Sequence, residues 1–202
     1  MVTSSLLANL AGIEHGFGTR HSSHTQDEMA SLKQIHSNIV LVADRPQGVI
    51  GDADALVVVD PGVTVSIRTA DCLPILLADV RTGAVAAVHA GWRGTAAGIV
   101  GKTLERMLAE FGSRPEDVVA AIGPGIGKCC YEVGVDVARQ FGQEQAGKID
   151  LAEHNRQQLL RAGVGQIEVV SPCTYCQGET FFSYRREGER AGRMISFIRR
   201  VR

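Results

Sequence analysis

The stretch that decides the fold is TADCLPILLADVRTGAVAAVHAGWRGTAAGIV, from Thr69 to Val100. It contains two apolar runs, LPILLAD and AVAAVHA, which are separated by the turn-like tripeptide RTG. Short apolar and β-branched runs bounded by Gly, Asp or Pro are typical of strands, so the stretch predicts a hairpin. Cys72 lies just before the first strand and His89 near the end of the second, and functional side chains are commonly presented at strand ends.

Similar apolar runs on both sides of this hairpin predict further strands. They are NIVLVAD (38–44), ALVVVD (55–60), VTVSIRTAD (63–71), DVVAAIG (117–123) and the closing run RMISFIRRV (193–201). Their nearly unbroken apolar content is typical of central strands that are buried on both faces.

Three segments have the periodicity of helices. In TAAGIVGKTLERMLAEFG (95–112), one stripe holds Ile99, Val100, Leu104, Met107 and Leu108, and Gly112 suits the position after the helix end. DLAEHNRQQLLRAGV (150–164) opens with a capping pair, Asp150 and Glu153, and GVDVARQFG (134–142) predicts a shorter helix. Hairpins mixed with helices, without strict strand–helix alternation, predict an α+β fold. We expect one domain over residues 1–202, with a mixed central β-sheet and flanking helices.

Composition narrows the class of protein. The 202 residues carry a formal net charge of -1, so the sequence lacks the excess of Lys and Arg that nucleic-acid binding requires. No apolar run approaches the roughly 20 residues of a membrane span, and no basic region precedes the short apolar patch at the N-terminus. Five irregularly spaced cysteines are typical of free cytosolic thiols. We therefore expect a cytoplasmic protein without nucleic-acid or membrane partners; the sequence leaves its oligomeric state open.

A metal site is one interpretation of the reactive side chains. His36 precedes another predicted strand, and together with Cys72 and His89 it supplies imidazole and thiolate, the ligands that zinc prefers. Two His and one Cys leave a fourth coordination position open, as in catalytic zinc sites. Such long separations are weak evidence, and the spacing alone favours the alternative, a buried structural thiol with hydrogen-bonded histidines.

Six motifs in fixed order resemble one known family. KQIHS, GDADALV, TADCLPILLAD, AAVHAGWRG, AIGPGIGKCCYEVG and FFSYRR are similar to those of polyphenol oxidase (laccase-domain) proteins, also called peptidoglycan editing factors. The resemblance runs from about His15 to Phe197. It implies a single-domain α+β protein in which His36, Cys72 and His89 bind zinc, with copper as the alternative metal. Between HGFGTR and KQIHS this chain has only HSSHTQDEMASL, which is shorter than the family usually has there.

The resemblance also implies an activity on small molecules. Family members are described as purine nucleoside phosphorylases, which convert adenosine, inosine or methylthioadenosine and phosphate into the free base and ribose 1-phosphate. Adenosine deamination is described as a companion activity. We therefore expect a nucleoside and phosphate as substrates.

Phosphorolysis requires a cationic cradle for phosphate. Arg93 follows the turn after His89 at a predicted helix start, where free backbone N–H groups favour anions. Arg68, Arg186 and Ser183 are further candidates, and Arg185 lies beside them.

Deamination requires a carboxylate that moves protons. Asp71 is the candidate, and we expect it to reach the site only if the chain turns between Ala70 and Pro74. Its alternative roles are to cap that turn or to orient His89.

The remaining cysteines and the single tryptophan have plainer interpretations. Cys129, Cys130, Cys173 and Cys176 could form a second zinc centre, but adjacent cysteines chelate one ion awkwardly, so packing or free thiols are favoured. SPCTYCQ contains the P-C-x-x-C of zinc deaminases, yet the H-x-E partner is missing from the sequence. Trp92 is expected to pack in the core.

Three other functions are weighed against the phosphorylase. In a cysteine hydrolase, Cys72 would attack an amide of a cell-wall precursor with His89 as its base, which the editing-factor name favours. A structural zinc that only pins strands would make the protein non-enzymatic. Multicopper oxidation requires more histidine ligands than the six of this chain provide.

Overall fold

The computed structural model describes residues 1–170 and 172–201. Its elements, in chain order, are α1 (Ser5–Ala8), β1 (Ile13–Gly16), η1 (Gln26–Glu28), β2 (Ala30–Lys33), β3 (Val40–Val42), β4 (Gly48–Asp52), β5 (Ala55–Val58), β6 (Thr64–Thr69), β7 (Leu73–Asp79), β8 (Val85–Ala90), α2 (Trp92–Ala96), α3 (Ile99–Phe111), η2 (Pro115–Asp117), β9 (Val118–Ile122), β10 (Glu132–Val133), α4 (Val135–Arg139), β11 (Gly147–Lys148), α5 (Leu151–Arg161), β12 (Gln166–Val169), α6 (Tyr184–Glu187), η3 (Gly188–Arg190) and β13 (Met194–Arg200).

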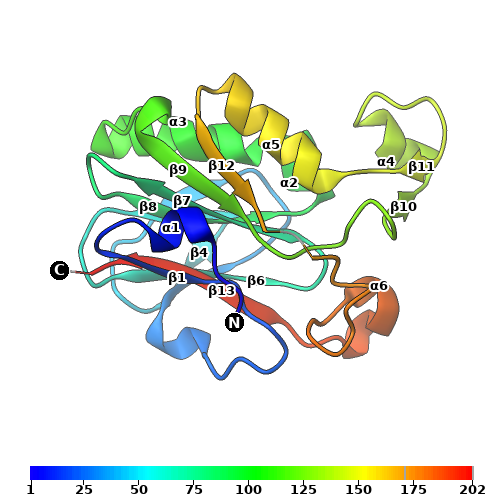
Figure 1. Ribbon diagram of the computed structural model, residues 1–202, viewed down its shortest axis with the longest axis horizontal. Coiled ribbons are helices and arrows are strands. Elements are labelled where there is room, and N and C mark those ends of the chain that lie inside the picture. The colour runs from blue at the N-terminus through cyan, green and yellow to red at the C-terminus, as the bar shows by residue number, and fades with distance from the viewer. Residues whose placement is uncertain (171, 202) are drawn as a thin grey trace.

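Two large sheets, a two-stranded sheet (β10-β11) and a layer of helices make up the molecule (Figure 1). A six-stranded sheet has the order β12-β9-β7-β8-β5-β3, and a five-stranded sheet has the order β1-β13-β6-β2-β4. Both contain parallel and antiparallel pairs, and α3 and α5 lie on the outer face of the six-stranded sheet. The predicted α+β class, with a mixed sheet and flanking helices, is confirmed.

The predicted hairpin forms the middle of the six-stranded sheet. β7 and β8 pair antiparallel, with Pro74 opposite His89, and all their residues are buried. Alternate side chains point to opposite faces. Leu73, Ile75 and Leu77 therefore pack under the helices, whereas Leu76 and Ala78 pack against the five-stranded sheet.

The helix predicted over 95–112 is broken into α2 and α3. Gly98 adopts a left-handed conformation (φ 74°) between them, and Gly112 ends α3 in the same conformation, as predicted. Ile99, Val100, Leu104 and Met107 are buried against the sheet, but Leu108 is 51% exposed, contrary to its predicted place in the stripe. Four residues advance a helix by about 400°, so each i+4 step moves roughly 40° further around, away from the sheet.

The other two predicted helices are present. The carboxylate of Asp150 accepts the backbone N–H of Glu153 and caps α5, and α4 covers 135–139. The carboxylate of Glu153 binds Arg156 and Gln157, on the next turn of the helix. None of the helices in the described residues has the length and hydropathy of a membrane span.

Candidate functional site

Three ligand-type side chains meet where β7 begins and β8 ends. One ligand atom each from His36, Cys72 and His89 lies within 4.8 Å of the others. The two imidazole rings are in edge contact, with centroids 4.9 Å apart and an angle of 78° between their planes. The structure thus brings together the three positions that the sequence singled out, although they are far apart in the chain.

Tight turns make this convergence possible. In the described residues, His36 (φ 59°) and Asp71 (φ 81°) are the non-glycine residues with positive φ, a strained conformation that is often found at functional sites. The chain therefore does turn between Ala70 and Pro74. A Cβ atom at Gly91 would lie 2.9 Å from Cys72 Sγ and 3.4 Å from His36 Cδ2, so only glycine leaves room for both ligands.

A buried carboxylate, Asp54, connects two of the three side chains. Its Oδ1 accepts a hydrogen bond from His89 Nδ1 at 2.8 Å and another from the His36 backbone N–H at 3.0 Å. Its Oδ2 accepts the N–H and the hydroxyl of Ser37, at 2.5 and 2.7 Å. Asp54 thereby fixes both the ring of His89 and the loop that carries His36. Sequence reasoning missed this residue, although GDADALV places it directly before a buried strand.

The charges of these groups support one another. Burial alone would raise the pKa of Cys72, but the neighbouring imidazoles of His89 and His36 lower it to about 6. Burial alone would lower the pKa of His89, but the Cys72 thiolate and Asp54 raise it to about 9. Burial opposes ionisation of Asp54 too, yet its hydrogen bonds to His89 and Ser37 lower its pKa to about 2.

This donor set fits a zinc ion. The thiolate is the favoured form of Cys72, and the bond between His89 Nδ1 and Asp54 leaves Nε2 as the ligating nitrogen. Two imidazoles and one thiolate leave one vertex of a tetrahedron for a water or a substrate. The same donors also accept copper, because imidazole and thiolate are ligands of both metals.

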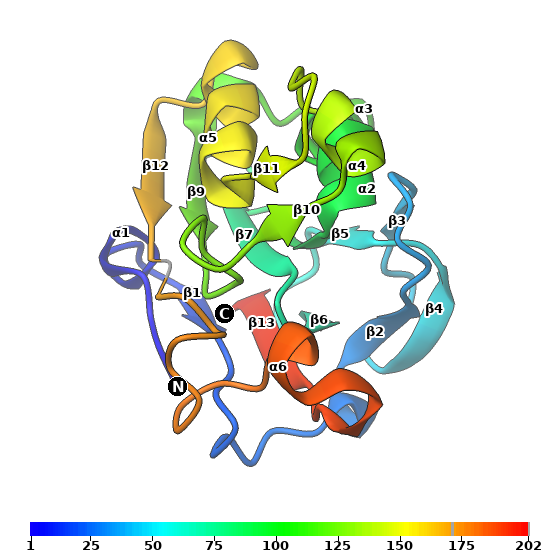
Figure 2. The ribbon, with the colours of Figure 1, turned by 90° about the vertical axis from the view of Figure 1, so that its right-hand side faces the viewer.

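The three side chains lie at one end of a cavity of about 770 Å³. The residues that line it also include Asp71, three arginines and two tyrosines: Arg68, Arg185, Arg193, Tyr131 and Tyr184. Pockets for small-molecule ligands typically measure about 300–1,000 Å³. Figure 2 faces the end of the molecule where α6 and β10 lie; they are joined by a hydrogen bond from Arg185 to the carbonyl of Glu132.

Arg68 and Asp71 reach the cavity as predicted, with different surroundings. In residues 1–170 and 172–201, the Arg68 guanidinium has no hydrogen-bond or ion-pair partner, whereas its backbone pairs with the side chain of Gln34. The Asp71 carboxylate accepts hydrogen bonds from Thr174 Oγ1 (2.7 Å), Ser183 Oγ (3.1 Å) and the Arg185 N–H (2.6 Å). It therefore caps and anchors turns, while His89 is oriented by Asp54.

Three predicted phosphate ligands lie outside the walls of the cavity. The exposed Arg93 stacks 4.4 Å from the ring of Trp92, which itself packs against the core. Ser183 is buried and caps α6, and Arg186 donates to the carbonyls of Thr174, Tyr175 and Phe181. Their positions leave Arg68, Arg185 and Arg193 as the cations of the cavity.

Sequence reasoning did not assign Arg193, Tyr131 or Tyr184 to the site. Both tyrosines lie in quoted motifs, GKCCYEVG and FFSYRR, which could have identified them, whereas Arg193 follows η3 outside these motifs. The shortened segment, 21–32, contributes none of the described residues that line the cavity.

Comparison with known proteins identifies relatives over nearly the whole chain. The family model described as multi-copper polyphenol oxidoreductase laccase matches residues 16–201. A purine nucleoside phosphorylase of Bacteroides thetaiotaomicron is 42% identical over 201 residues, covering 87% of this chain and 74% of that protein. A protein named adenosine deaminase RL5, from an unknown prokaryotic organism, is 35% identical over 199 residues, covering 86% of this chain and 76% of its own length.

Solved structures share the fold. The hypothetical protein YfiH of Bacillus licheniformis superposes with a TM-score of 0.88 at 26% identity, covering 96% of this chain and 94% of that one. The arrangement of both sheets is therefore common to this chain and its relative.

Proposed function

The chain belongs to the family described as multi-copper polyphenol oxidoreductase laccase, and we propose that its activity is that of a zinc-dependent purine nucleoside phosphorylase. The name of the Bacteroides relative supports this reaction class. The observation that carries the proposal is one cavity that joins a His₂Cys donor set to the free guanidinium of Arg68. In phosphorolysis, phosphate attacks C1′ of the ribose as the base leaves, so a phosphate-binding cation beside a Lewis acid that can polarise substrate oxygens suits this reaction.

His36, Cys72 and His89 would hold the zinc ion. When bound, zinc supplies a Lewis acid that polarises oxygen ligands and lowers the pKa of a coordinated water. Asp54 keeps His89 in the tautomer that presents Nε2, and it holds His36 through the backbone.

The remaining wall residues would bind the two substrates. Arg68 offers an uncommitted guanidinium, which binds phosphate oxygens through two parallel hydrogen bonds. Tyr131 and Tyr184 offer ring faces for a purine, and guanidinium groups lie over both: Arg185 is 5.3 Å from the first ring and Arg193 is 5.9 Å from the second. We propose adenosine, inosine and methylthioadenosine as the nucleosides.

Deamination of adenosine is proposed as a side activity. The relative named adenosine deaminase RL5 supports it, and Asp71 is the carboxylate of the cavity wall beside Cys72. Because three hydrogen-bond donors hold Asp71, it would exchange protons from a fixed position.

The test is an assay of the purified, zinc-loaded protein with a panel of purine nucleosides. We expect free base and ribose 1-phosphate in equal amounts, only when phosphate is present. Removal of the metal with a chelator should abolish the reaction, and added zinc should restore it. If no nucleoside releases base in the presence of phosphate and zinc, the proposal fails.

A cysteine hydrolase is the second candidate function, and one observation favours it. Cys72, His89 and Asp54 have the order of a nucleophile, its base and the carboxylate that orients the base. In that case a metal would block the thiolate, so chelation should raise the turnover of an amide such as a muramoyl–amino acid. Opposite responses to chelation therefore separate the two functions.

We also propose that the protein works in the cytoplasm. All five cysteines are free, and free thiols are maintained in reducing compartments. Nucleosides and phosphate are abundant small molecules there, which suits the proposed substrates.

A further inference from the structure

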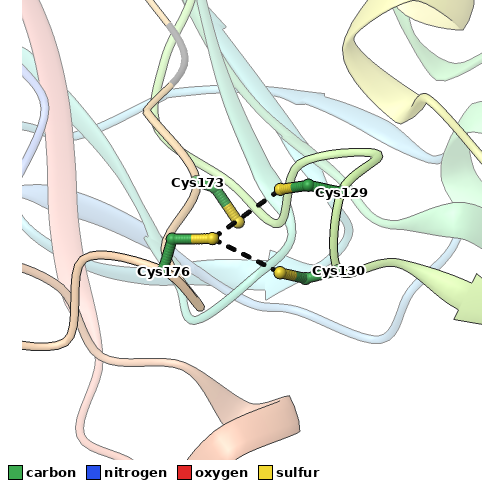
Figure 3. A group of neighbouring side chains, drawn as sticks. All are labelled: Cys129, Cys130, Cys173 and Cys176. Atoms are coloured by element: carbon green, nitrogen blue, oxygen red, sulfur yellow. Dashed lines mark hydrogen bonds between the residues drawn. The ribbon is translucent and has the colours of Figure 1, made fainter.

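The four remaining cysteines meet at a second place in the molecule (Figure 3). Cys129 and Cys130 lie in the turn between β9 and β10, and Cys173 and Cys176 lie in the turn that follows β12. All four sulfur atoms are within 4.8 Å of one another. Cys176 Sγ is 3.4 Å from Cys130 Sγ and 3.7 Å from Cys129 Sγ.

We propose that these four thiols bind a second zinc ion as a tetrahedral thiolate site. With Zn–S bonds of about 2.3 Å, the sulfur atoms of a regular tetrahedron lie about 3.8 Å apart. The observed separations are close to this value. They exceed the S–S bond of about 2.05 Å in a disulfide. Figure 3 shows the four side chains directed from two turns toward a common space.

The backbone at Gly127 leaves space for the sulfur atoms and donates a hydrogen bond to one of them. The N–H of Gly127 donates to Cys173 Sγ at 3.2 Å, and such bonds favour the thiolate that a metal requires. A Cβ at Gly127 would lie 3.1 Å from Cys173 Cβ and 3.3 Å from Cys129 Sγ, so glycine leaves space for both thiols. The two turns are also joined through the bridge between Gly125 and Cys173.

Adjacent cysteines are compatible with one site in this geometry. The N–H of Cys130 donates to the carbonyl of Gly127, which closes a tight turn that brings Cys129 and Cys130 to the same side as Cys176. The sequence alone favoured packing or free thiols for these residues, because a dipeptide does not reveal the turn that redirects its side chains.

Nearby cations suit the charge of such a site. Four thiolates around Zn²⁺ carry a net charge of about −2, which buried or half-buried sites balance with positive groups. Two cations and one acidic residue, Lys148, Arg185 and Glu132, line a depression of about 290 Å³ together with Cys129 and Cys130. Lys148 Nζ donates to the Cys129 carbonyl at 2.9 Å, which holds the ammonium next to the cluster.

The position of the cluster indicates a structural role. Four protein ligands leave no open vertex, so this ion would fix the two turns instead of binding substrate. Both turns border the cavity of the first site: Tyr131 follows Cys130, and Thr174, between Cys173 and Cys176, donates to Asp71. The second zinc ion would therefore hold one wall of the cavity in place.

The test counts metal ions in the whole protein and in two matched variants, each of which removes one thiol. Purified under reducing conditions with zinc supplied, the wild-type protein should bind two ions per chain by native mass spectrometry. Cys72→Ser should keep the ion of the cysteine cluster, and Cys176→Ser, at an exposed position, should lose it. Replacing zinc by cobalt in Cys72→Ser gives an independent readout. All remaining thiols of that variant lie in the cluster, so thiolate-to-cobalt absorption of a tetrahedral site must come from it.

Several results would overturn the proposal. One is that Cys72→Ser binds no ion; another is that Cys176→Ser binds as many ions as the wild-type protein. A third is a mass that is lower by two hydrogens per pair of cluster cysteines, which would mean that they form disulfides under reducing conditions. If Cys176→Ser does not fold, the cobalt spectrum of Cys72→Ser decides, and absence of the thiolate absorption refutes the site.

Discussion

Asp54 illustrates how one carboxylate sets the geometry of a site that is assembled from distant segments. It is fully buried, and both of its oxygens accept several hydrogen bonds from groups that belong to the site. A buried carboxylate is costly unless it is paired in this way. Folding therefore fixes the position of the Asp54 carboxylate, and the carboxylate in turn fixes the positions of His89 and of the loop that carries His36.

Asp54→Asn should weaken zinc binding. The amide lacks the charge that favours protonation of His89 Nδ1, and its NH₂ group cannot accept the bonds from Ser37. Loss of a carboxylate partner of a metal-bound histidine typically costs about 10–100-fold in metal affinity. Competition with a chromophoric chelator would measure the change. An unchanged zinc affinity would show that Asp54 does not position the ligands.

Gly91→Ala should disrupt the metal site by steric overlap alone. The new methyl group would lie 2.9 Å from Cys72 Sγ, and we expect zinc affinity to fall by at least about tenfold, as ligand misplacement does. Gly101→Ala is the matched control, because a Cβ atom there meets nothing within 4 Å and the position lies inside α3. That control should gain about 0.5–1 kcal/mol in the free energy of unfolding and keep its zinc affinity. Equal zinc affinities in both variants would contradict the steric argument.

At the scale of elements, the sequence predicted individual helices and strands well, but it predicted poorly which strands pair with one another. The buried hairpin, α5 with its Asp150 cap and the end of α3 at Gly112 follow from patterns that are local in the chain. The five-stranded sheet was missed, because an apolar run does not reveal which strand it pairs with. The convergence of the three candidate ligand positions was predictable from motifs, whereas the cavity wall also depends on α6 and on residues after η3, whose contacts are set by tertiary structure.

The cation that binds phosphate can be assigned to one element by a pair of variants. Arg68 at the end of β6 faces the cavity, whereas Arg93 in α2 stacks on Trp92. Arg68→Ala should raise the KM for phosphate by roughly 10- to 150-fold, since a charge-assisted hydrogen bond contributes about 1.5–3 kcal/mol. Arg93→Ala should leave this KM unchanged. The opposite ranking in steady-state kinetics would place phosphate at the start of α2.

At the scale of the whole molecule, the N-terminus is tied to a distant strand by a cluster of polar groups. Ser4 N donates to His15 Nε2 at 2.9 Å, so His15 must be neutral there. The Glu168 carboxylate of β12 accepts from Ser4 Oγ at 2.6 Å and from Leu6 N at 2.9 Å. These bonds join α1 and β1 to the edge of the six-stranded sheet.

This tie predicts a dependence of stability on pH. Burial lowers the pKa of His15 below 6.5, against the attraction of Glu168. Below pH 6.5 the unfolded chain therefore binds a proton that the folded chain excludes, and the free energy of unfolding should fall as the pH decreases. The pKa of Glu168 is also lowered: burial opposes ionisation, but hydrogen bonds from Leu6 and Ser4 outweigh it. The contribution of Glu168 to the free energy of unfolding should be lost below pH 4.5, as the pH falls through the pKa of the folded state.

Chemical denaturation at several pH values would measure both effects. His15→Gln should flatten the decline below pH 6.5, whereas the same substitution at the exposed His21 should not. A decline that persists unchanged in His15→Gln would assign it to other groups.

The pairing of β6 with β13 has a consequence for biosynthesis. Cys72 follows β6, and the neighbour of β6 on one side is the last strand of the chain. β6 therefore cannot take its final place in the sheet before β13 has been synthesised and has paired with it. The turn that carries Cys72 is thus completed late in folding, and until then we expect its thiol to be accessible to oxidants and to competing ions.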